Sequence, residues 1–200
     1  MKVLWVSGWG IDLGFFHAYV EHIFPMFDHT VREPCPQNLP MSGFDWIIGY
    51  SLGCNVVLHR HTDCSPSAKL ALVAPFLAFA KESGQGGKIT SAEVKLTKRT
   101  LRLEPLLAIH SFYEKACLNH SITKLPYELN HLFWGLDMLL TAKPKATSLA
   151  KADFLIIGDS DPLIESDKIC QHFPKANLVL KGVGHDFQEL LPKLPIFKRK

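Results

Sequence analysis

Residues 46–60 read WIIGYSLGCNVVLHR, and this stretch decides the fold. Its apolar beginning predicts a buried strand, and residues 51–61 predict a helix. Between the two, Gly49, Ser51 and Gly53 have the G-x-S-x-G spacing of a nucleophile elbow, a sharp strand-to-helix turn that exposes a serine hydroxyl. Glycines suit such a turn because the backbones of strand and helix approach each other closely. An ordinary turn is the alternative, and the rest of the sequence has to decide between them.

Other short runs of Val, Leu and Ile are apolar throughout rather than alternating. Such runs are typical of parallel strands that are covered on both faces. Helical patterns lie between them, and this alternation predicts an α/β fold with a mainly parallel central sheet and right-handed crossovers. The predicted strands are residues 3–7, 46–51, 70–75, 153–159 and 177–182, and the predicted helices are residues 11–24, 51–61 and 165–173.

Residues 80–149 have a different pattern, with helical segments and no clear strand. The predicted helices of this region are residues 91–103, 105–118 and 126–140. A helical insertion between two strands forms a natural lid over the carboxyl ends of a sheet, where open α/β sheets bind ligands. We therefore expect an α/β core of residues 1–79 and 150–200, and a helical lid of residues 80–149.

A serine hydroxyl needs a base within hydrogen-bond reach before it becomes a good nucleophile. Among ten histidines, His185 stands apart because it follows the last predicted strand on a glycine-rich loop, KGVGHDF. A solvated loop histidine is the alternative interpretation. The base in turn needs a carboxylate that fixes its tautomer. The segment LIIGDSDPLI supplies Asp159 and Asp161 at the end of a strand. We favour Asp161 as the acid, with Asp159 as a turn residue, and Asp137 is a weaker candidate.

The developing oxyanion of an acyl transfer needs hydrogen-bond donors. Leu52 follows the serine and offers one backbone N–H, and the turn SGWGID after the first strand offers a second at Trp9. A plain strand-to-helix turn is the alternative for that segment. The order Ser51, Asp161, His185 along the chain is that of α/β-hydrolases.

Composition narrows the class of protein. A hydrophobic content of 47% and a net charge of +3 suit a soluble globular protein, and the charge is too small to indicate nucleic acid. Five cysteines without a CxxC pair, together with the absence of a recognisable leader, indicate reduced thiols and a cytoplasmic location. The longest apolar run, residues 70–80, is interrupted by Pro75 and is too short to insert into a membrane.

His59 and His61 fit a helix end better than a metal site, and we expect no metal and no cofactor.

The blocks SGWGIDLGFF, GYSLG, WGLDML, GDSDPLI and GVGHDF together resemble the pimeloyl-acyl-carrier-protein methyl ester esterases of biotin biosynthesis, which are α/β-hydrolases. The resemblance implies a serine carboxylesterase with Ser51 as nucleophile, Asp161 as acid and His185 as base. It also implies an oxyanion hole formed by the backbone N–H groups of Trp9 and Leu52. Aromatic side chains line the acyl channel in this family, and the candidates here are Phe76, Phe79, Phe112, Trp134 and Phe187. Packing in the core is the commoner role of such aromatics, and we expect about half of them to contact the channel.

The sequence departs from the family pattern at three places. Ser7 stands where the family usually has a histidine before Gly-Trp-Gly, which affects the support of the oxyanion loop but not its amide. Cys54 replaces a small residue after the elbow, and we expect it to pack in the helix. The sequence begins at the strand that carries VLWV, so we expect the leading hairpin of the family to be missing from the sheet.

The first lid helix carries Lys95, Lys98, Arg99 and Arg102 at spacings that place them on one face. Val94, Thr97 and Leu101 lie roughly opposite and suit packing. A solvated basic face is the commoner explanation of such a stripe. In view of the resemblance, it would also steer an acidic acyl carrier protein that bears the substrate. No aromatic interleaving or binding motif accompanies the charges, so nucleic acid is a poor alternative.

The same residues leave other functions open. Fold and triad do not separate the pimeloyl ester from the substrates of a general short-chain carboxylesterase or a thioesterase. A hydrolase-fold binding protein without turnover is a further alternative, which the intact Ser51, Asp161 and His185 disfavour.

Overall fold

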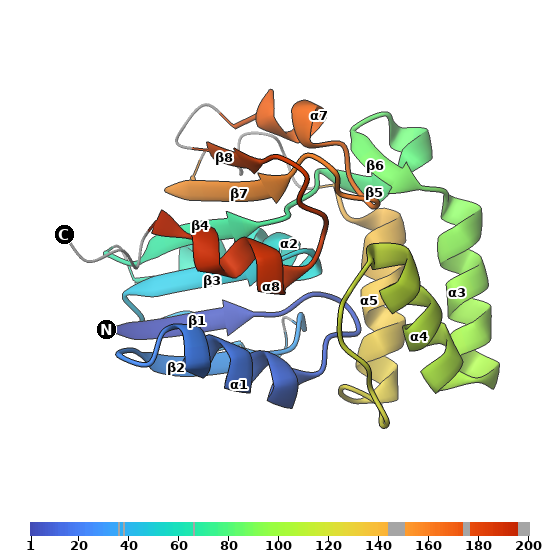
Figure 1. Ribbon diagram of the computed structural model, residues 1–200, viewed down its shortest axis with the longest axis horizontal. Coiled ribbons are helices and arrows are strands. Elements are labelled where there is room, and N and C mark those ends of the chain that lie inside the picture. The colour runs from blue at the N-terminus through green and yellow to red at the C-terminus, as the bar shows by residue number, and fades with distance from the viewer. Residues whose placement is uncertain (36, 38, 66, 144–150, 174–176, 196–200) are drawn as a thin grey trace.

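The computed structural model describes all residues except 36, 38, 66, 144–150, 174–176 and 196–200. Its centre is a six-stranded sheet in the order β2-β1-β3-β4-β7-β8 (Figure 1). Every strand pair in this sheet is parallel. The strands are β1 (Lys2–Val6), β2 (Asp28–Arg32), β3 (Trp46–Tyr50), β4 (Lys69–Val73), β7 (Phe154–Gly158) and β8 (Asn177–Leu180).

Helices cover both faces of the sheet, as the apolar strands require. In Figure 1, α1 (Leu13–Ile23) and α8 (Phe187–Leu190) lie in front of the sheet, and α2 (Leu52–Arg60) lies behind it. The interior strands β1, β3, β4 and β7 are almost wholly buried. All five predicted strands are confirmed, as β1, β3, β4, β7 and β8. Strand β2 was not predicted from the sequence, because its residues DHTVR are mostly polar and half-exposed. It lies at an edge of the sheet, where one side needs no cover.

The order of the strands places a switch point between β1 and β3. From β1 the chain runs outward to β2, and it then returns to β3 on the other side of β1. The loops that leave the carboxyl ends of two such strands diverge and open a crevice, which is the usual ligand site of an open α/β sheet. The turn at Trp9 follows β1 and the turn at Ser51 follows β3, so both lie at this switch point.

The lid region lies beyond the carboxyl ends of the strands (Figure 1). It contains the helices α3 (Ser91–Leu103), α4 (Pro105–Ala116) and α5 (Leu129–Thr141). Val94 and Leu101 of α3 are buried and Thr97 is half-buried, as the pattern predicts. The expected border at residue 80 coincides with the end of a short strand, and the border at 149 and 150 lies outside the described residues.

The expectation of a lid region without strands was wrong. Strands β5 (Ala78–Ala80) and β6 (Gly86–Ile89) form a small parallel pair before α3. The sequences AFA and GGKI are too short to show a period, and a strand with two glycines is disfavoured by propensity.

The short helix α7 (Ser166–Cys170) follows later, between β7 and β8. Within the described residues, no helix has the length and apolar character needed to cross a membrane.

The two glycines beside Ser51 are required by close packing. A Cβ atom on Gly53 would lie 2.1 Å from the carbonyl oxygen of Val6, which belongs to the neighbouring strand β1. A Cβ atom on Gly49 would lie 2.7 Å from the backbone of Cys54. Both clashes involve backbone atoms that cannot rotate away. Helix α2 can therefore start directly above β1 and β3 only because these residues lack side chains.

We predict that Gly53→Ala lowers the free energy of unfolding by about 1–3 kcal/mol or more, because the added methyl group forces α2 away from β1. Chemical denaturation measures this change. Gly184→Ala is the matched control, since a Cβ atom there meets nothing within 4 Å. Equal stability of the two variants would contradict the close approach of α2 to the sheet.

Candidate active site

Ser51 occupies the turn between β3 and α2 in a strained backbone conformation. Its φ angle is 52°, in the left-handed region that residues other than glycine rarely adopt. The turn is held by backbone hydrogen bonds, because the Ser51 N–H donates to the Val73 carbonyl at 2.8 Å and its own carbonyl accepts from the Cys54 N–H at 3.0 Å. This geometry is that of a nucleophile elbow rather than of an ordinary turn.

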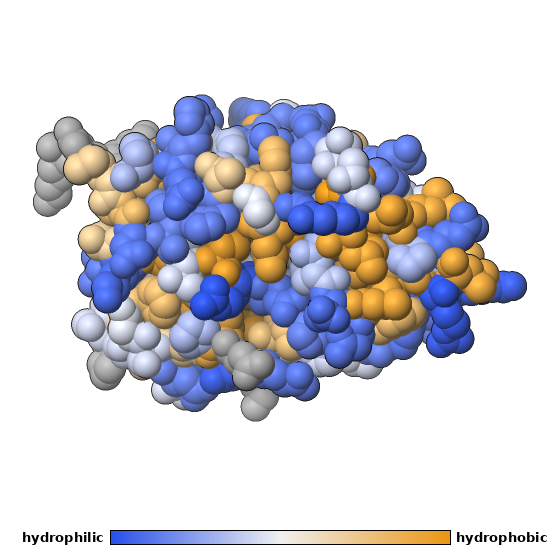
Figure 2. Space-filling model, turned by 90° about the horizontal axis from the view of Figure 1, so that it is seen from below, coloured by the Kyte–Doolittle hydropathy of each residue, from blue (hydrophilic) through white to orange (hydrophobic). Residues whose placement is uncertain are grey.

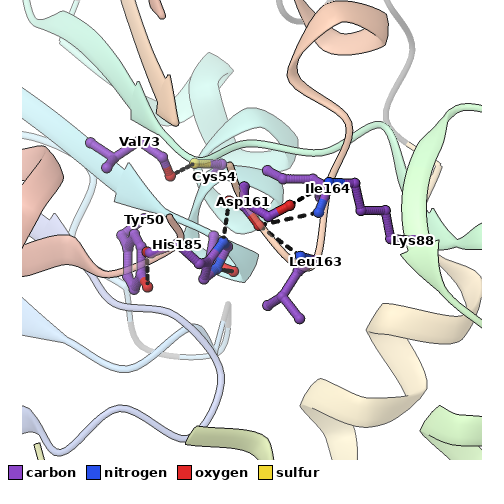
Figure 3. A network of polar contacts seen from close by, with 9 residues as sticks. Tyr50, Cys54, Val73, Lys88, Asp161, Leu163, Ile164 and His185 are labelled. Carbon is purple, nitrogen blue, oxygen red and sulfur yellow. Dashed lines mark hydrogen bonds and ion pairs between the residues drawn. The ribbon is translucent and has the colours of Figure 1, made fainter. Parts of the chain in front are cut away.

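His185 lies on the loop between β8 and α8, with 1% of its surface exposed. Its Nε2 atom is 3.0 Å from the Ser51 hydroxyl oxygen. The backbone carbonyl of His185 accepts a hydrogen bond of 2.8 Å from the Tyr50 hydroxyl, which helps to fix the loop (Figure 3). Burial, aided by the negative charge of Asp186, raises the pKa of Tyr50 well above its ordinary value, so this hydroxyl stays a donor. The alternative of a solvated loop histidine is excluded by this burial.

Asp161 completes the chain of hydrogen bonds from a wholly buried position after β7. Its Oδ2 atom is 2.6 Å from Nδ1 of His185. The other oxygen, Oδ1, accepts from the backbone N–H groups of Leu163 at 2.8 Å and Ile164 at 3.2 Å (Figure 3). A buried carboxylate with these partners favours the Nδ1–H tautomer of His185, in which Nε2 accepts a hydrogen bond from the Ser51 hydroxyl.

The two other acidic candidates do not reach His185. Asp159 is exposed, and its Oδ1 atom accepts from the Gly182 N–H at 2.7 Å and from the Ser160 hydroxyl at 2.9 Å. It therefore joins the ends of β7 and β8, in agreement with its interpretation as a turn residue. Asp137 of α5 is exposed and forms an ion pair with Lys98 of α3, which ties two lid helices together.

The candidate oxyanion loop is held by the lid. The Trp9 indole N–H donates to the Leu132 carbonyl of α5 at 2.8 Å. Beside it, the Gly10 N–H donates to the Tyr127 hydroxyl, and the Gly10 carbonyl accepts from the Tyr113 hydroxyl, each at 2.8 Å. Burial raises the pKa of both tyrosines, so both remain protonated. Sequence reasoning missed these two tyrosines, because no spacing rule connects residues so far apart along the chain.

Two backbone donors remain available at the turn. Leu52 is the first residue of α2, so the helix itself does not use its N–H group. Within the described residues, no acceptor contacts the Trp9 N–H. Ser7, which precedes this loop, is fully buried. Both N–H groups lie just after the carboxyl ends of adjacent strands, and neither has a hydrogen-bond partner among the residues that the structure describes, as an oxyanion hole would require.

The thiol beside the elbow is inert. Cys54 is buried, and its Sγ atom donates to the carbonyl oxygens of Gly49 at 3.1 Å and Val73 at 3.3 Å. Burial raises the pKa of this thiol far above its ordinary range. A thiolate therefore does not form at neutral pH, in agreement with the expected packing role.

An apolar cavity of about 300 Å³ lies between the lid helices and the loop that carries Asp161. Phe79 and Phe112 line it, and Leu163 connects it to the acid loop. Neither Ser51 nor His185 lines it, and Ser51 itself is only 4% exposed. Ser51 is therefore buried in this structure, and the cavity borders the site through Leu163 of the acid loop.

The other three aromatic candidates lie elsewhere. Phe76 is buried against Phe79, with ring centroids 5.2 Å apart, and Trp134 is partly buried on α5. Phe187 packs against Phe16 and Tyr50 below the histidine loop. The cavity does not include these three side chains.

The cations of α3 divide into two groups. Lys95, Arg99 and Arg102 are exposed and have no ion-pair partner among the described residues, whereas Lys98 is neutralised by Asp137. Two leucines of the same helix, Leu96 and Leu103, are also exposed, at 62% and 69%. Figure 2 shows hydrophobic side chains gathered over the lid end of the molecule.

His59 is exposed at the end of α2, and the described part of the chain holds no group of three or more residues suited to a metal ion.

No family model and no curated protein matches the sequence. Solved structures do match it. The esterase EaEST from Exiguobacterium antarcticum matches with a TM-score of 0.70 at 13% identity, and the match covers 92% of this chain and 85% of the other.

 

Two further solved structures match over most of their length. The hydrolase olei00960 from Oleispira antarctica has a TM-score of 0.66 at 12% identity, with 98% of this chain and 89% of the other covered. BioG from Haemophilus influenzae has a TM-score of 0.60 at 14% identity, with 92% and 88% covered. Identities this low carry the fold and not the activity. The parallel six-stranded sheet, its flanking helices and the helical insertion therefore assign this chain to the α/β-hydrolase fold.

Proposed function

We propose that this protein is a serine ester hydrolase. The observation that carries the proposal is the buried chain of hydrogen bonds from Asp161 through His185 to Ser51, with the serine on a strained elbow. In this role Ser51 is the nucleophile, His185 is the base and Asp161 is the acid that orients the imidazole. A purely structural role does not explain why a polar chain of this kind lies wholly buried at the switch point of the sheet.

The reaction proceeds in two steps. In the first, His185 takes the hydroxyl proton of Ser51 while the serine oxygen attacks the ester carbonyl, and the same proton then passes to the departing alcohol. In the second, His185 takes a proton from water, the hydroxide attacks the acyl-enzyme, and Ser51 regains its proton as the acid leaves. In both steps the backbone N–H groups of Trp9 and Leu52 stabilise the negative charge on the former carbonyl oxygen.

For the substrate, we propose the methyl ester of pimeloyl-acyl carrier protein. Three observations support this choice. The sequence blocks around the site resemble those of the esterases that act on this ester, and the apolar cavity beside the acid loop suits an acyl chain. The outer face of α3 combines the exposed Lys95, Arg99 and Arg102 with exposed leucines, which fits an acidic carrier protein. We assign Lys98 a smaller part in docking than the other three cations, because it already pairs with Asp137.

A general short-chain carboxylesterase or thioesterase is the second candidate. The specific observation in its favour is that the cavity walls are mainly apolar and would accept any acyl chain of suitable length. A hydrolase-fold binding protein without turnover is the least favoured, because all three members of the proposed triad are present and in contact.

We predict that Asp161→Asn lowers kcat for a p-nitrophenyl ester by about 10⁴-fold, because an amide at this position favours the wrong imidazole tautomer. Asp159→Asn is the matched control, since Asp159 is exposed and contacts Gly182 rather than His185. Steady-state kinetics of the two variants measure the difference. Similar rates in the two variants would contradict the role of Asp161.

We also predict that the wild-type chain hydrolyses methyl pimeloyl-acyl carrier protein and restores biotin-independent growth to cells that lack their own methyl ester esterase. Ser51→Ala should lose both activities by several orders of magnitude, because it removes the nucleophile. Mass spectrometry of the carrier protein measures loss of the methyl group with the thioester intact. Failure to cleave this ester, with p-nitrophenyl esters still cleaved, would favour the general esterase. Failure on all esters would favour the binding protein.

Neutralising Lys95, Arg99 and Arg102 together separates docking from chemistry. This variant should have a higher KM for the carrier-bound ester and an unchanged KM for small esters, because only the carrier contacts the cationic face. Removing the exposed Lys81, Lys181 and Lys193, which lie outside α3, controls for net charge. An equal effect of the two triple variants would contradict docking on α3.

A further inference from the structure

The loop that carries Asp161 is attached to the lid by strand β6. The Lys88 N–H donates to the Leu163 carbonyl at 2.9 Å, and the Glu165 N–H donates to the Gly86 carbonyl at 2.7 Å. Gly87 and Ile164 form an antiparallel bridge between these two bonds. The segment that follows Asp161 is therefore paired with a strand of the insertion rather than with a strand of the central sheet.

The side chain of Lys88 adds a contact to Asp161 itself. Its ammonium group donates to the backbone carbonyl oxygen of Asp161 at 2.5 Å (Figure 3). The lysine is half-buried, and no carboxylate pairs with it among the described residues. A hydrogen bond from a charged donor is stronger than one between neutral groups, particularly when it is shielded from water. The backbone of Asp161 is thus held by Lys88, while its side chain is held by Leu163, Ile164 and His185.

We propose that Lys88 is a positioning residue for the proposed hydrolysis, acting through Asp161. Asp161 precedes Pro162, which has no N–H to anchor the turn, so the carbonyl between them is a natural point of attachment. Lys88 keeps this peptide in place, and Oδ2 of Asp161 then lies within 2.6 Å of His185. Displacements of about 1 Å in catalytic groups cost on the order of 100-fold in rate. The role rests on the proposed function, and it makes β6 a support for the proposed acid.

The test compares Lys88→Met, which keeps the length of the side chain but removes the charge and the donor, with Lys88→Arg, which keeps both. We expect Lys88→Met to lower kcat for p-nitrophenyl butyrate by roughly 10- to 100-fold with little change in KM. Lys88→Arg should restore most of the rate. Lys168→Met is the matched control, because Lys168 pairs with Glu165 beside the same segment but does not contact Asp161. Lys88→Gln, with a shorter neutral side chain, should repeat the loss and serves if the Met variant does not fold.

Three results would overturn the positioning role while leaving the proposed function intact. They are an unchanged kcat in Lys88→Met and Lys88→Gln, an equal loss in Lys168→Met, and a loss in Lys88→Arg as large as that in Lys88→Met. Circular dichroism and chemical denaturation confirm that the compared variants are folded. A wild-type chain that cleaves no ester would overturn the proposed function and this role with it.

Discussion

A buried carboxylate must have partners for its charge, and in this protein that requirement organises the site. Asp161 is wholly buried, and it accepts two backbone hydrogen bonds on one oxygen and the His185 imidazole on the other. Leaving such a charge without a partner typically costs about 3–5 kcal/mol. The acid loop, the histidine loop and the serine elbow therefore have to meet in one arrangement, and the parallel sheet brings their three strands to the same edge.

The lid contributes to this arrangement as well as covering it. Tyr113 and Tyr127 hold both backbone groups of Gly10 in the candidate oxyanion loop, and Leu132 accepts from the Trp9 indole. On the other side of the site, β6 pairs with the acid loop and Lys88 contacts Asp161. The insertion thus touches both the proposed charge-stabilising donors and the proposed acid.

The core and the proposed triad could be predicted from sequence because each rests on local chemistry. Strands such as β3 and β4 are continuously apolar. Ser51 lies between Gly49 and Gly53, where a Cβ atom would come within 3 Å of backbone atoms, so both positions require glycine. Strand β2 and the β5–β6 pair could not be predicted, since they are polar or too short to show a period. Lys88, Tyr113 and Tyr127 act through contacts between residues distant in sequence, which no spacing reveals. The four cations on α3 look equivalent in the sequence. The structure shows that one of them, Lys98, forms an ion pair with Asp137.

The central claim is that Ser51, His185 and Asp161 act on an acyl group whose oxygen faces the N–H groups of Trp9 and Leu52. A crystal structure of the chain after reaction with an alkyl fluorophosphonate tests it most directly. The account predicts a covalent bond from phosphorus to the Ser51 oxygen, with the phosphoryl oxygen about 2.7–3.1 Å from both backbone nitrogens. An adduct on another residue, or a phosphoryl oxygen that neither nitrogen reaches, would contradict it.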